Sequence, residues 1–299
     1  MTDVQMGELA AVGTAVLWTF STLAWTSAGK HLGATAVCFV RLLLACVLLS
    51  GYGRLVHGLW WPSDASAERW LVLGASGVAG FFLADLLVFK AFLVIGPRLT
   101  LLLQSLTPPL AAQLSWFVLG ERLNAWQWLA MGVTLAGVVW VVLERPNGSA
   151  DEHDVRRTVQ GIVLAVLGAA VAAVALVLSK KGLGDYDVAE ATFIRVLGGV
   201  AGFVVLITAN RRWPSVAAVA SHRRAMALVA FGTLVGPFAG VILYMISLRH
   251  CPAGVVATII ATMPVLILPC VIVLYREDVS RRAIGGAVLS VVGVALLML

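Results

Sequence analysis

Residues 144–158 read ERPNGSADEHDVRRT and form the longest polar stretch in a chain of 299 residues. Pro146, Asn147 and Gly148 are residue types that interrupt helices and favour turns, and charged residues of both signs follow them. Long apolar runs lie on either side of this stretch. The stretch therefore predicts a surface connection that divides the chain into two units, residues 1–149 and 150–299.

The composition of the chain excludes a water-soluble fold. Hydrophobic residues make up 61% of the sequence and charged residues 12%, and the mean hydropathy is +0.97, whereas soluble domains are about 45–50% apolar and about 25% charged. The net charge of +6 is carried at the ends of apolar runs, which suits loops at a lipid surface and not a nucleic-acid partner. We expect an integral protein of the lipid bilayer.

Apolar runs long enough to cross a membrane recur along the whole chain. A membrane core about 30 Å thick needs about 20 apolar residues of helix. Ten such runs are present, and the weakest boundary is Gly96, Pro97 and Arg98 between the third and the fourth. The runs are 9–29, 34–53, 70–95, 99–119, 125–143, 159–179, 188–208, 225–247, 254–275 and 282–299. The sequence predicts an all-α fold of ten transmembrane helices, five on each side of the central connection.

Chemically distinctive residues recur in the same order in the two halves. The pairs are Pro108 with Pro264, Glu121 with Glu277, and Arg41 with Arg195, at separations of 156, 156 and 154 residues. We interpret them as an internal duplication. Because each copy has an odd number of spans, the second copy must enter the membrane from the opposite side, so the two repeats are predicted to be inverted. Inverted repeats are typical of secondary transporters, whose substrate site lies near the midplane.

Pro108 and Pro264 lie near the middle of the fourth and ninth predicted spans. A proline inside a helix removes a backbone hydrogen bond and leaves a carbonyl free, so a matched pair suits a substrate cavity between the halves. Prolines are also common in membrane helices, which leaves a purely structural interpretation open. Gln104 lies one turn before Pro108 and is a further candidate for the cavity lining.

Asp85 is the only carboxylate deep within a predicted span. A charge at the bilayer centre costs at least about 2.5–3.5 kcal/mol, so Asp85 needs a cation, water or a proton beside it. It is a candidate ligand for a substrate amine or a site for a coupling proton, and alternatively a structural residue in an ion pair. Lys90 lies five residues on and falls on a different face of the helix.

Arg41 and Arg195 lie within the second and seventh predicted spans. They are candidates for gates or for binding an anionic group, and alternatively they extend toward the membrane surface and stabilise helix ends. The remaining candidates for the cavity lining are semi-polar residues at membrane depth: Trp18 and Thr22 in the first span, Tyr244 in the eighth, and Thr258 and Thr262 in the ninth. Packing between helices through small hydroxylated residues is the alternative.

The sequence carries no recognisable catalytic motif. It lacks a Walker loop and the metalloprotease and serine-hydrolase signatures, and its four cysteines lack the spacing of a metal or redox site. We therefore expect no enzyme, no metal and no cofactor. The N-terminus lacks the basic start of a signal peptide, so the first apolar run is expected to remain in the mature protein.

The order of these motifs resembles the drug/metabolite transporter superfamily, and within it the ten-helix EamA-type exporters. The features are Leu17-Trp18, the Phe-x-Arg that ends at Arg41 and at Arg195, residues 103–108 (LQSLTP), residues 119–122 (LGER), Gly132 and Gly137. The second copy departs from the family, with Tyr275-Arg276-Glu277 where Leu-Gly-Glu is usual. The resemblance implies a basket-like bundle of two inverted five-helix repeats, with Trp18, Pro108 and Pro264 on helices that line the cavity. It places Glu121 and Glu277 at helix ends, in a structural or a gating role.

The resemblance also implies a function. Members of the family export amino acids and related metabolites or small drugs, and bacterial exporters of aromatic and neutral amino acids are the most similar in function. The leading hypothesis is a secondary transporter of small metabolites, foremost amino acids, that works by alternating access. A carrier of drugs or of anionic metabolites such as nucleotide sugars is the alternative, and the latter needs several cations around the cavity. A membrane scaffold or a lipid-handling protein is the alternative from a different class.

The family places such a protein in the bacterial inner membrane with both termini in the cytoplasm. In that orientation the predicted cytoplasmic loops carry six Lys and Arg residues and the opposite loops carry twelve, which is contrary to the positive-inside rule. The coupling ion is left open between a proton and none. The assembly is left open between a monomer and a weak homodimer.

Overall fold

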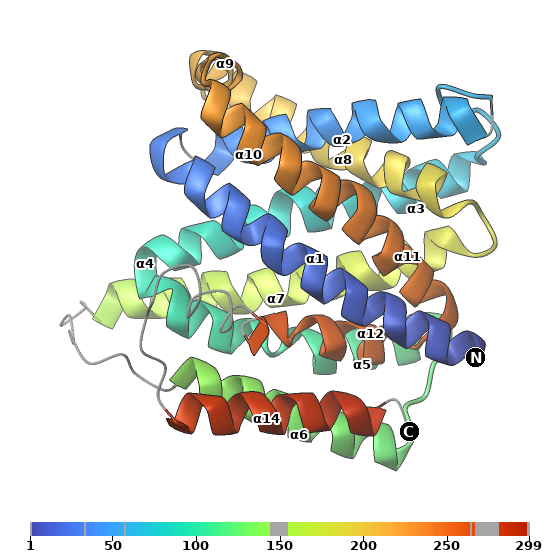
Figure 1. The fold of residues 1–299 in the computed structure, drawn as a ribbon, viewed down its shortest axis with the longest axis vertical. Coiled ribbons are helices and arrows are strands. Elements are labelled where there is room, and N and C mark those ends of the chain that lie inside the picture. The colour runs from blue at the N-terminus through green and yellow to red at the C-terminus, as the bar shows by residue number, and fades with distance from the viewer. Residues whose placement is uncertain are drawn as a thin grey trace.

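The computed structural model describes residues 2–32, 34–56, 58–143, 155–263, 265–266 and 281–297. Within these ranges every regular element is a helix, and the helices lie together in one bundle (Figure 1). Two candidates from the sequence, Pro264 and Glu277, lie outside the described residues. The first half comprises α1 (Asp3–Leu32), α2 (Ala34–Val56), α3 (Ala67–Gly77), the π-helix η1 (Val78–Ala84), α4 (Asp85–Gln104), α5 (Thr107–Leu119) and α6 (Ala125–Leu143). The second half comprises α7 (Val155–Leu183), α8 (Val188–Ala209), α9 (Trp213–Ser221), α10 (Arg223–Thr233), the π-helix η2 (Leu234–Gly240), α11 (Val241–His250), α12 (Ala253–Ile260) and α14 (Arg281–Leu297).

Seven helical segments are long and apolar enough to cross a membrane. They are Asp3–Trp25, Thr35–Val56, Ala67–Ala91, Ala125–Leu143, Val159–Leu183, Val188–Ala209 and Arg223–His250, and α14 is shorter but also apolar. A helix satisfies its backbone hydrogen bonds internally, as a lipid environment requires. The predicted all-helical membrane fold is therefore confirmed in the described residues, whereas the number of ten spans stays a prediction.

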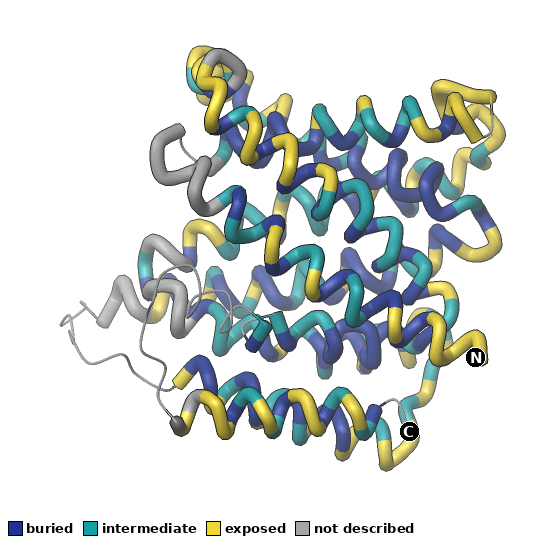
Figure 2. Tube along the Cα trace, in the orientation of Figure 1, coloured by how far each residue is buried: buried dark blue, intermediate teal, exposed yellow. Residues whose placement is uncertain are grey.

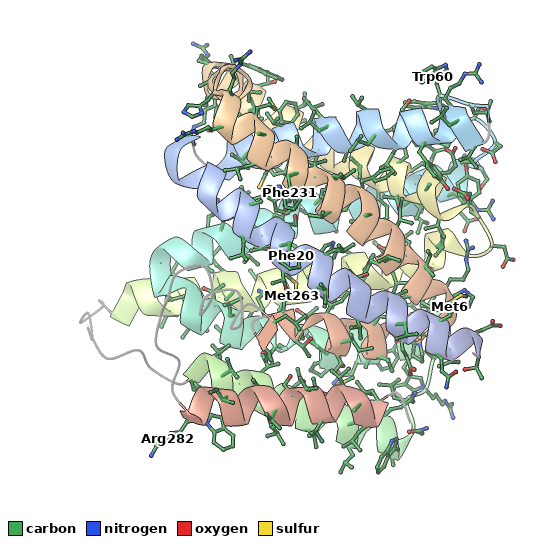
Figure 3. All side chains as sticks on the ribbon, in the orientation of Figure 1. Met6, Phe20, Trp60, Phe231, Met263 and Arg282 are labelled. Atoms are coloured by element: carbon green, nitrogen blue, oxygen red, sulfur yellow. The ribbon has the colours of Figure 1, made fainter. Side chains whose placement is uncertain are left out.

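The outward faces of the bundle are apolar. Figure 2 shows exposed residues along the outer sides of the helices, and many of these residues are large hydrophobics. Phe20 on α1 and Phe231 on α10 are both exposed and are labelled on the side chains of Figure 3. Exposed apolar surface of this extent marks contact with a membrane rather than with water.

The two halves repeat the same succession of helix types. The elements α3, η1 and α4 begin at Ala67, Val78 and Asp85, and α10, η2 and α11 begin 156 residues later, at Arg223, Leu234 and Val241. Turns interrupt the helices at Ser105 and Leu106 in the first half and, at the same separation, at Ala261 and Thr262 in the second. Single-turn π-helices are uncommon, so two in register indicate that the halves share one architecture.

The predicted boundary at 96–98 does not end a helix. Helical backbone continues from Asp85 to Gln104, and the first interruption comes at Ser105. The chain nevertheless reverses within α4, because a Cβ on Gly168 of α7 would lie 3.5 Å from Leu87 and 3.3 Å from Gln104, whereas these two residues would be about 25 Å apart along a straight helix. The sequence therefore located a turn in the path of the chain but not the end of a helix.

Small residues bring pairs of helices into backbone contact. A Cβ on Gly77 of α3 would lie 1.8 Å from the carbonyl oxygen of Arg195 on α8, and a Cβ on Gly293 of α14 would lie 2.4 Å from the backbone nitrogen of Thr134 on α6. Close approach through small residues is the usual way in which membrane helices associate. Glycine at these positions thus fixes the α3–α8 and α6–α14 contacts, and α6 and α14 lie side by side in Figure 1.

Candidate functional site

Arg41 and Asp85 form an ion pair inside the bundle. Asp85 is the first residue of α4, directly after the π-helix η1, and Arg41 lies on α2. The Nη2 atom of Arg41 donates a hydrogen bond to Oδ2 of Asp85, and their side chains expose 10% and 32% of their surface. The partner of Asp85 is therefore an arginine from another helix. The ion-pair interpretation of Asp85 has geometric support, and its partly accessible carboxylate still leaves room for a ligand.

The ion pair is surrounded by α1 and α10. The guanidinium of Arg41 lies 4.3 Å from the ring centroid of Trp25 on α1, within cation–π distance. The hydroxyl of Thr233 on α10 donates to the carbonyl oxygen of Arg41 over 3.4 Å. The Nε atom of Arg41 is buried without a hydrogen-bond partner, although buried donors are usually satisfied. The site thus holds one unused donor beside a partly exposed carboxylate.

Arg195 lies in a different kind of environment. Its Nε atom donates to the hydroxyl of Ser76 over 2.9 Å, and Nη1 lies 3.4 Å from the sulfur of Met245. The ring centroids of Phe81 and Tyr244 lie 5.1 and 5.3 Å from its guanidinium carbon. The guanidinium is thus held by a hydroxyl and by aromatic faces, and the described residues place no carboxylate in an ion pair with it.

Trp18 and Tyr244 come together next to this arginine. Their ring centroids are 5.7 Å apart, with Trp18 half-buried on α1 and Tyr244 buried on α11. Gly240 at the end of η2 allows the contact, because a Cβ there would lie 2.6 Å from the indole of Trp18. The structure therefore brings together two residues that the sequence proposed for the cavity lining.

Several other candidates are engaged in helix packing. Gln104 donates from Nε2 to the carbonyl oxygen of Ala165 on α7 over 3.0 Å. Thr258 and Thr262 are buried, and their hydroxyls donate to carbonyls of the preceding turn. Thr22 is half-buried on α1. The contact of Gln104 supports the packing interpretation for this residue, whereas the two threonine hydroxyls bond within their own segment of the chain.

The expectation that Pro108 lies inside a continuous helix is wrong. Pro108 is buried in the first turn of α5, after the turn at Ser105 and Leu106. The first turn of a helix has no intrahelical partners for its N–H groups, so a proline there removes no hydrogen bond. Pro108 therefore starts a helix, and the bend before it comes from the interruption of the chain.

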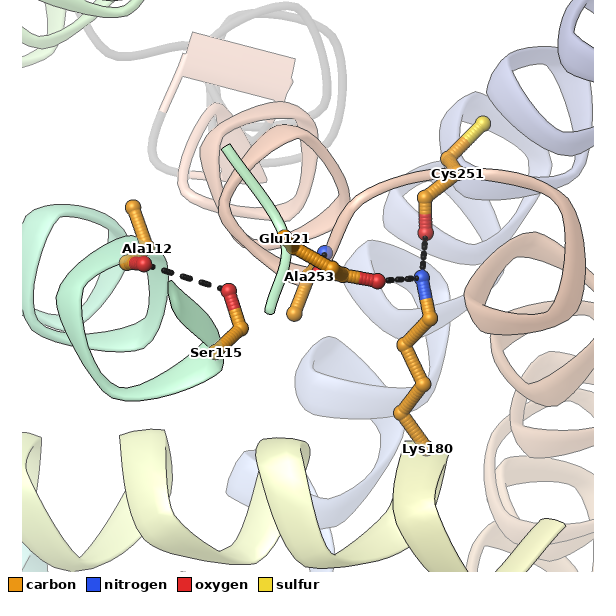
Figure 4. Close-up of polar contacts among 6 residues, drawn as sticks. All are labelled: Ala112, Ser115, Glu121, Lys180, Cys251 and Ala253. Atoms are coloured by element: carbon orange, nitrogen blue, oxygen red, sulfur yellow. Dashed lines mark hydrogen bonds and ion pairs between the residues drawn. The ribbon is translucent and has the colours of Figure 1, made fainter. Parts of the chain in front are cut away.

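Glu121, which follows α5, joins the two halves through the contacts drawn in Figure 4. In Figure 1 α5 and α12 lie toward the end of the bundle that carries both termini. Gly120 ends α5 in the left-handed conformation, with φ of 72°, and the carboxylate of Glu121 pairs with Lys180 on α7. The same carboxylate accepts the backbone N–H of Ala253, which starts α12, over 2.9 Å, and Lys180 also donates to the carbonyl oxygen of Cys251. We call Glu121, Lys180, Cys251 and Ala253 the Glu121 latch.

Further loop contacts lie at this same end. The hydroxyl of Tyr186 donates to Asp64 over 2.8 Å, Arg249 donates to the carbonyl oxygen of Tyr186, and the guanidinium of Arg69 lies 4.9 Å from the Tyr186 ring. Burial and the bond to Asp64 raise the pKa of the Tyr186 hydroxyl above its ordinary range. These contacts connect the loop before α3 with the loop before α8.

Two cavities in the described part of the chain lie away from these residues. One of about 380 Å³ is apolar and lies between α2 and α9, beside Leu43 and Trp213. The other, of about 370 Å³, is polar and lies where α3 begins and α7 ends, beside Arg69 and Lys181. None of the site candidates from the sequence lines either cavity. Among the described residues no group of three or more His, Cys, Asp or Glu side chains is placed to hold a metal.

Comparisons with known proteins agree with this architecture. The model of the EamA-like transporter family matches twice, at residues 5–143 and 159–299. A search of curated proteins found no match. Among 29 matching chains of solved structures, one titled "Crystal structure of protein" superposes with a TM-score of 0.74 at 19% identity, over 97% of this chain and 95% of the other; at that identity the likeness shows the fold alone. The two family matches cover nearly the whole chain, which therefore belongs to the EamA-like transporter family and is a multi-pass membrane transporter of the drug/metabolite transporter superfamily.

Proposed function

We propose that the chain is a secondary transporter that exports small metabolites, foremost amino acids, by alternating access. The observation that carries the proposal is the Arg41–Asp85 ion pair, with its accessible carboxylate. An amino acid carries an ammonium and a carboxylate on neighbouring atoms, as the pair carries opposite charges on neighbouring side chains. The substrate ammonium would bind Asp85, and the substrate carboxylate would bind Arg41.

Binding of the substrate in this way would leave every buried charge with a partner of opposite charge. A charge left alone in the membrane is costly, and breaking a buried pair by removing one partner is strongly destabilising. In the empty carrier Arg41 and Asp85 satisfy one another. In the loaded carrier the two ends of the zwitterion replace those contacts, and the unused Nε donor of Arg41 adds a hydrogen bond to the substrate carboxylate.

The aromatic residues next to Arg195 would accept the substrate side chain. Trp18 and Trp25 lie two turns apart on α1, about 10 Å along the helix axis. Trp25 packs on Arg41, and Trp18 packs on Tyr244. A substrate held by its charged groups at Arg41 therefore has aromatic surface within reach, which favours aromatic and neutral amino acids.

Two inverted repeats would supply the two conformations of alternating access. In Figure 1 α1 begins at one end of the bundle and its counterpart α7 begins at the other, which supports inversion. We propose that the chain has the ten spans predicted from its sequence. Since the Glu121 latch joins the halves at the end that carries the termini, it would keep that end closed and would open in the other conformation.

We propose a place in the bacterial inner membrane with both termini in the cytoplasm. The two ends of the chain lie at the same end of the bundle (Figure 1), as an even number of spans requires. The predicted loops on the other side of the membrane carry more Lys and Arg residues than the cytoplasmic loops, which is contrary to the positive-inside rule. Labelling of single cysteines placed at residues 3 and 185 from outside intact cells tests the orientation, since labelling of either residue contradicts cytoplasmic termini.

Uptake of labelled amino acids into liposomes that contain the purified protein tests the function. We expect saturable uptake that unlabelled aromatic and neutral amino acids inhibit. Asp85→Asn should lower the rate at least tenfold, because the neutral amide cannot replace the charge that faces the substrate ammonium. Asp185→Asn, at an exposed loop residue, should leave the rate unchanged.

The outcomes separate the alternative functions. Uptake of anionic metabolites such as nucleotide sugars, without uptake of amino acids, would contradict the assignment; among the described residues near the bundle interior, Arg41 is already paired and Arg195 is enclosed by Ser76 and aromatic rings. Uptake of cationic drugs alone would also contradict it. A folded protein that moves no solute in any panel would favour a scaffold or a lipid-handling role.

A further inference from the structure

Glu8 is a buried acid with an unsatisfied oxygen. The residue lies in the second turn of α1 and exposes only 4% of its surface. Its Oε2 atom is buried and has no hydrogen-bond partner, and it is the one carboxylate oxygen in that situation among the described residues. By contrast, Asp85 is paired with Arg41, and Glu121 is paired with Lys180. Buried polar groups are nearly always partnered, so Glu8 needs an explanation.

The start of α1 is pressed against the Glu121 latch. Gly7 precedes Glu8 in the chain, and a Cβ on Gly7 would lie 2.6 Å from the sulfur of Cys251 and 2.8 Å from the Cβ of His250. The thiol of Cys251 donates to the carbonyl oxygen of Val4 over 3.4 Å. The carbonyl oxygen of Cys251 accepts from Lys180, so Cys251 contacts α1 through its side chain and Lys180 through its backbone.

Glu8 and the latch share one electrostatic environment. The pKa of the Cys251 thiol is raised to about 12, first by burial, then by the negative charge of Glu8, against the positive charge of Lys180 and with a further rise from Glu121. Two carboxylates and one ammonium therefore act on the same thiol. With both acids ionised, the cluster carries one excess negative charge in apolar surroundings, and burial of an unpaired charge is unfavourable.

The other elements that pack on α1 do not supply the missing cation. On α10, Arg223 and Arg224 are exposed in the first turn, α9 has no ionisable residue, and on α2 Arg54 is exposed and donates to the carbonyl oxygen of Gly58. The elements η2 and α12 contain no ionisable residue. On α11, Arg249 is exposed and donates to the carbonyl oxygen of Tyr186, and Tyr244 packs on Trp18. His250 lies beside Gly7 through its Cβ. On α2, Arg41 is paired with Asp85.

We propose that Glu8 is a proton-binding site and that its proton is the coupling ion of transport; the coupling rests on the proposed function. When the latch is closed, the neutral carboxyl of Glu8 relieves the excess negative charge. When the latch opens, α1 separates from Cys251, water reaches Glu8, and the proton leaves to the solution on that side. Asp85 is paired with Arg41 in the empty carrier, and in this proposal it binds the substrate and not the coupling proton.

Infrared spectroscopy of the protein in liposomes tests the proton site without any transport assay. We expect a carboxylic-acid C=O band at neutral pH that Glu8→Gln removes and that Glu68→Gln, at an exposed residue in the first turn of α3, leaves in place. A band that survives Glu8→Gln, or the absence of any such band in the unaltered protein, overturns the assignment. Glu8→Leu, which restores no hydrogen bond, serves as the second variant if the amide disturbs folding.

Transport driven by a pH difference tests the coupling. In liposomes with the unaltered protein, an imposed pH gradient should drive accumulation of the amino acid. Glu8→Gln should reduce that accumulation at least tenfold while leaving exchange of labelled for unlabelled amino acid within twofold of normal. If Glu8→Gln accumulates substrate normally, or if the unaltered protein transports without any response to the gradient, the coupling is wrong. If the unaltered protein transports no amino acid, the proposed function fails, and the infrared result still decides the proton site.

Discussion

Arg41 and Arg195 occupy matching places in α2 and α8, yet they have opposite surroundings. Arg41 pairs with a carboxylate, whereas Arg195 is held by the hydroxyl of Ser76 and the rings of Phe81 and Tyr244. The residue that corresponds to Asp85 in the second half is Val241, which is buried. The two halves therefore share their helix geometry but not their chemistry, and a symmetric scaffold carries one asymmetric charged site.

The two halves also differ where the chain reverses direction, within α4 in the first half and between α11 and α12 in the second. In the first half the chain reverses within continuous helix, inside α4. In the second half, at the matching place, Cys251 and Pro252 separate α11 from α12, and Glu121 binds the freed N-terminus of α12. An interrupted helix offers backbone groups that a partner can hold and release, so we expect the latch end to be the first to respond to perturbation.

We expect the largest loss of stability when Gly77 is replaced by the residue type found at the matching position of the second half. The matching residue in α10 is Thr233, whose side chain fits, whereas any Cβ at residue 77 would collide with the carbonyl oxygen of Arg195. Gly77→Thr should destabilise the protein by about 3 kcal/mol or prevent folding. Thr233→Gly should cost only about 1 kcal/mol. Thermal unfolding in detergent measures both, and equal losses would show that the two contacts are equivalent after all.

The next largest effect is the difference in stability between variants of the two arginines. Arg41→Met leaves the carboxylate of Asp85 without its partner. Such a loss costs about 3–5 kcal/mol for a fully buried pair, and because the Asp85 side chain is 32% exposed, we expect about 2–3 kcal/mol. Arg195→Met removes a hydrogen bond but leaves no carboxylate behind, at about 1–2 kcal/mol. Combining Arg41→Met with Asp85→Leu should restore much of the stability while abolishing transport. A double variant as unstable as Arg41→Met alone would contradict the pairing.

The Glu121 latch should give a smaller effect. Its ion pair is partly exposed, so Lys180→Met should favour the open end by about 1 kcal/mol, a roughly fivefold change in population. The rate at which a thiol reagent labels Cys251, in a background without the other cysteines, should rise accordingly. Lys181→Met, at the exposed neighbouring lysine, is the matched control. Equal rates in both variants would rule out the latch.

The smallest expected effect is on the pH dependence of stability, through the contact between Tyr186 and Asp64 in the loops before α8 and α3. The pKa of Tyr186 is raised by burial and by its bond to Asp64, so the native protein keeps the phenol neutral where the unfolded chain ionises it, from a pKa of about 10 upward. This stabilisation is complete below pH 10 and is lost as pH rises. Melting temperatures should therefore fall more steeply above pH 10 in the unaltered protein than in Tyr186→Phe, and parallel curves would contradict this.

The sequence predicts the scaffold better than the site. Hydropathy and the matched residues predict helices, two halves and the equivalence of Arg41 with Arg195, since these depend on local composition and order. The partner of Asp85 could not be found in this way, because helical spacing relates only residues of one helix, and Arg41 comes from another. Pro108 was misplaced because hydropathy does not register the turn at Ser105 that makes it a helix start.

The burial of Glu8 could not be predicted from the sequence for the same reason, because it depends on contacts with other helices. Glu8 belongs to the acidic start of the chain, and composition alone gives no reason to bury it. Its burial depends on Cys251, which is distant in sequence and reaches α1 only through tertiary packing. The latch is similar, since the acidic residue of the LGER motif is visible in the sequence while Lys180 and the N–H of Ala253 are not.

The contact between α6 and α14 has a consequence for biosynthesis. The glycines at 137 and 293 match these helices to one another, but α14 leaves the ribosome long after α6. Roughly 150 residues separate their ends, which at about 5–20 residues per second delays the pairing by about 8–30 s. During that interval α6 lacks its native partner in the membrane. An insertion chaperone or the translocon that shields α6 until translation ends would therefore improve the yield of the complete carrier.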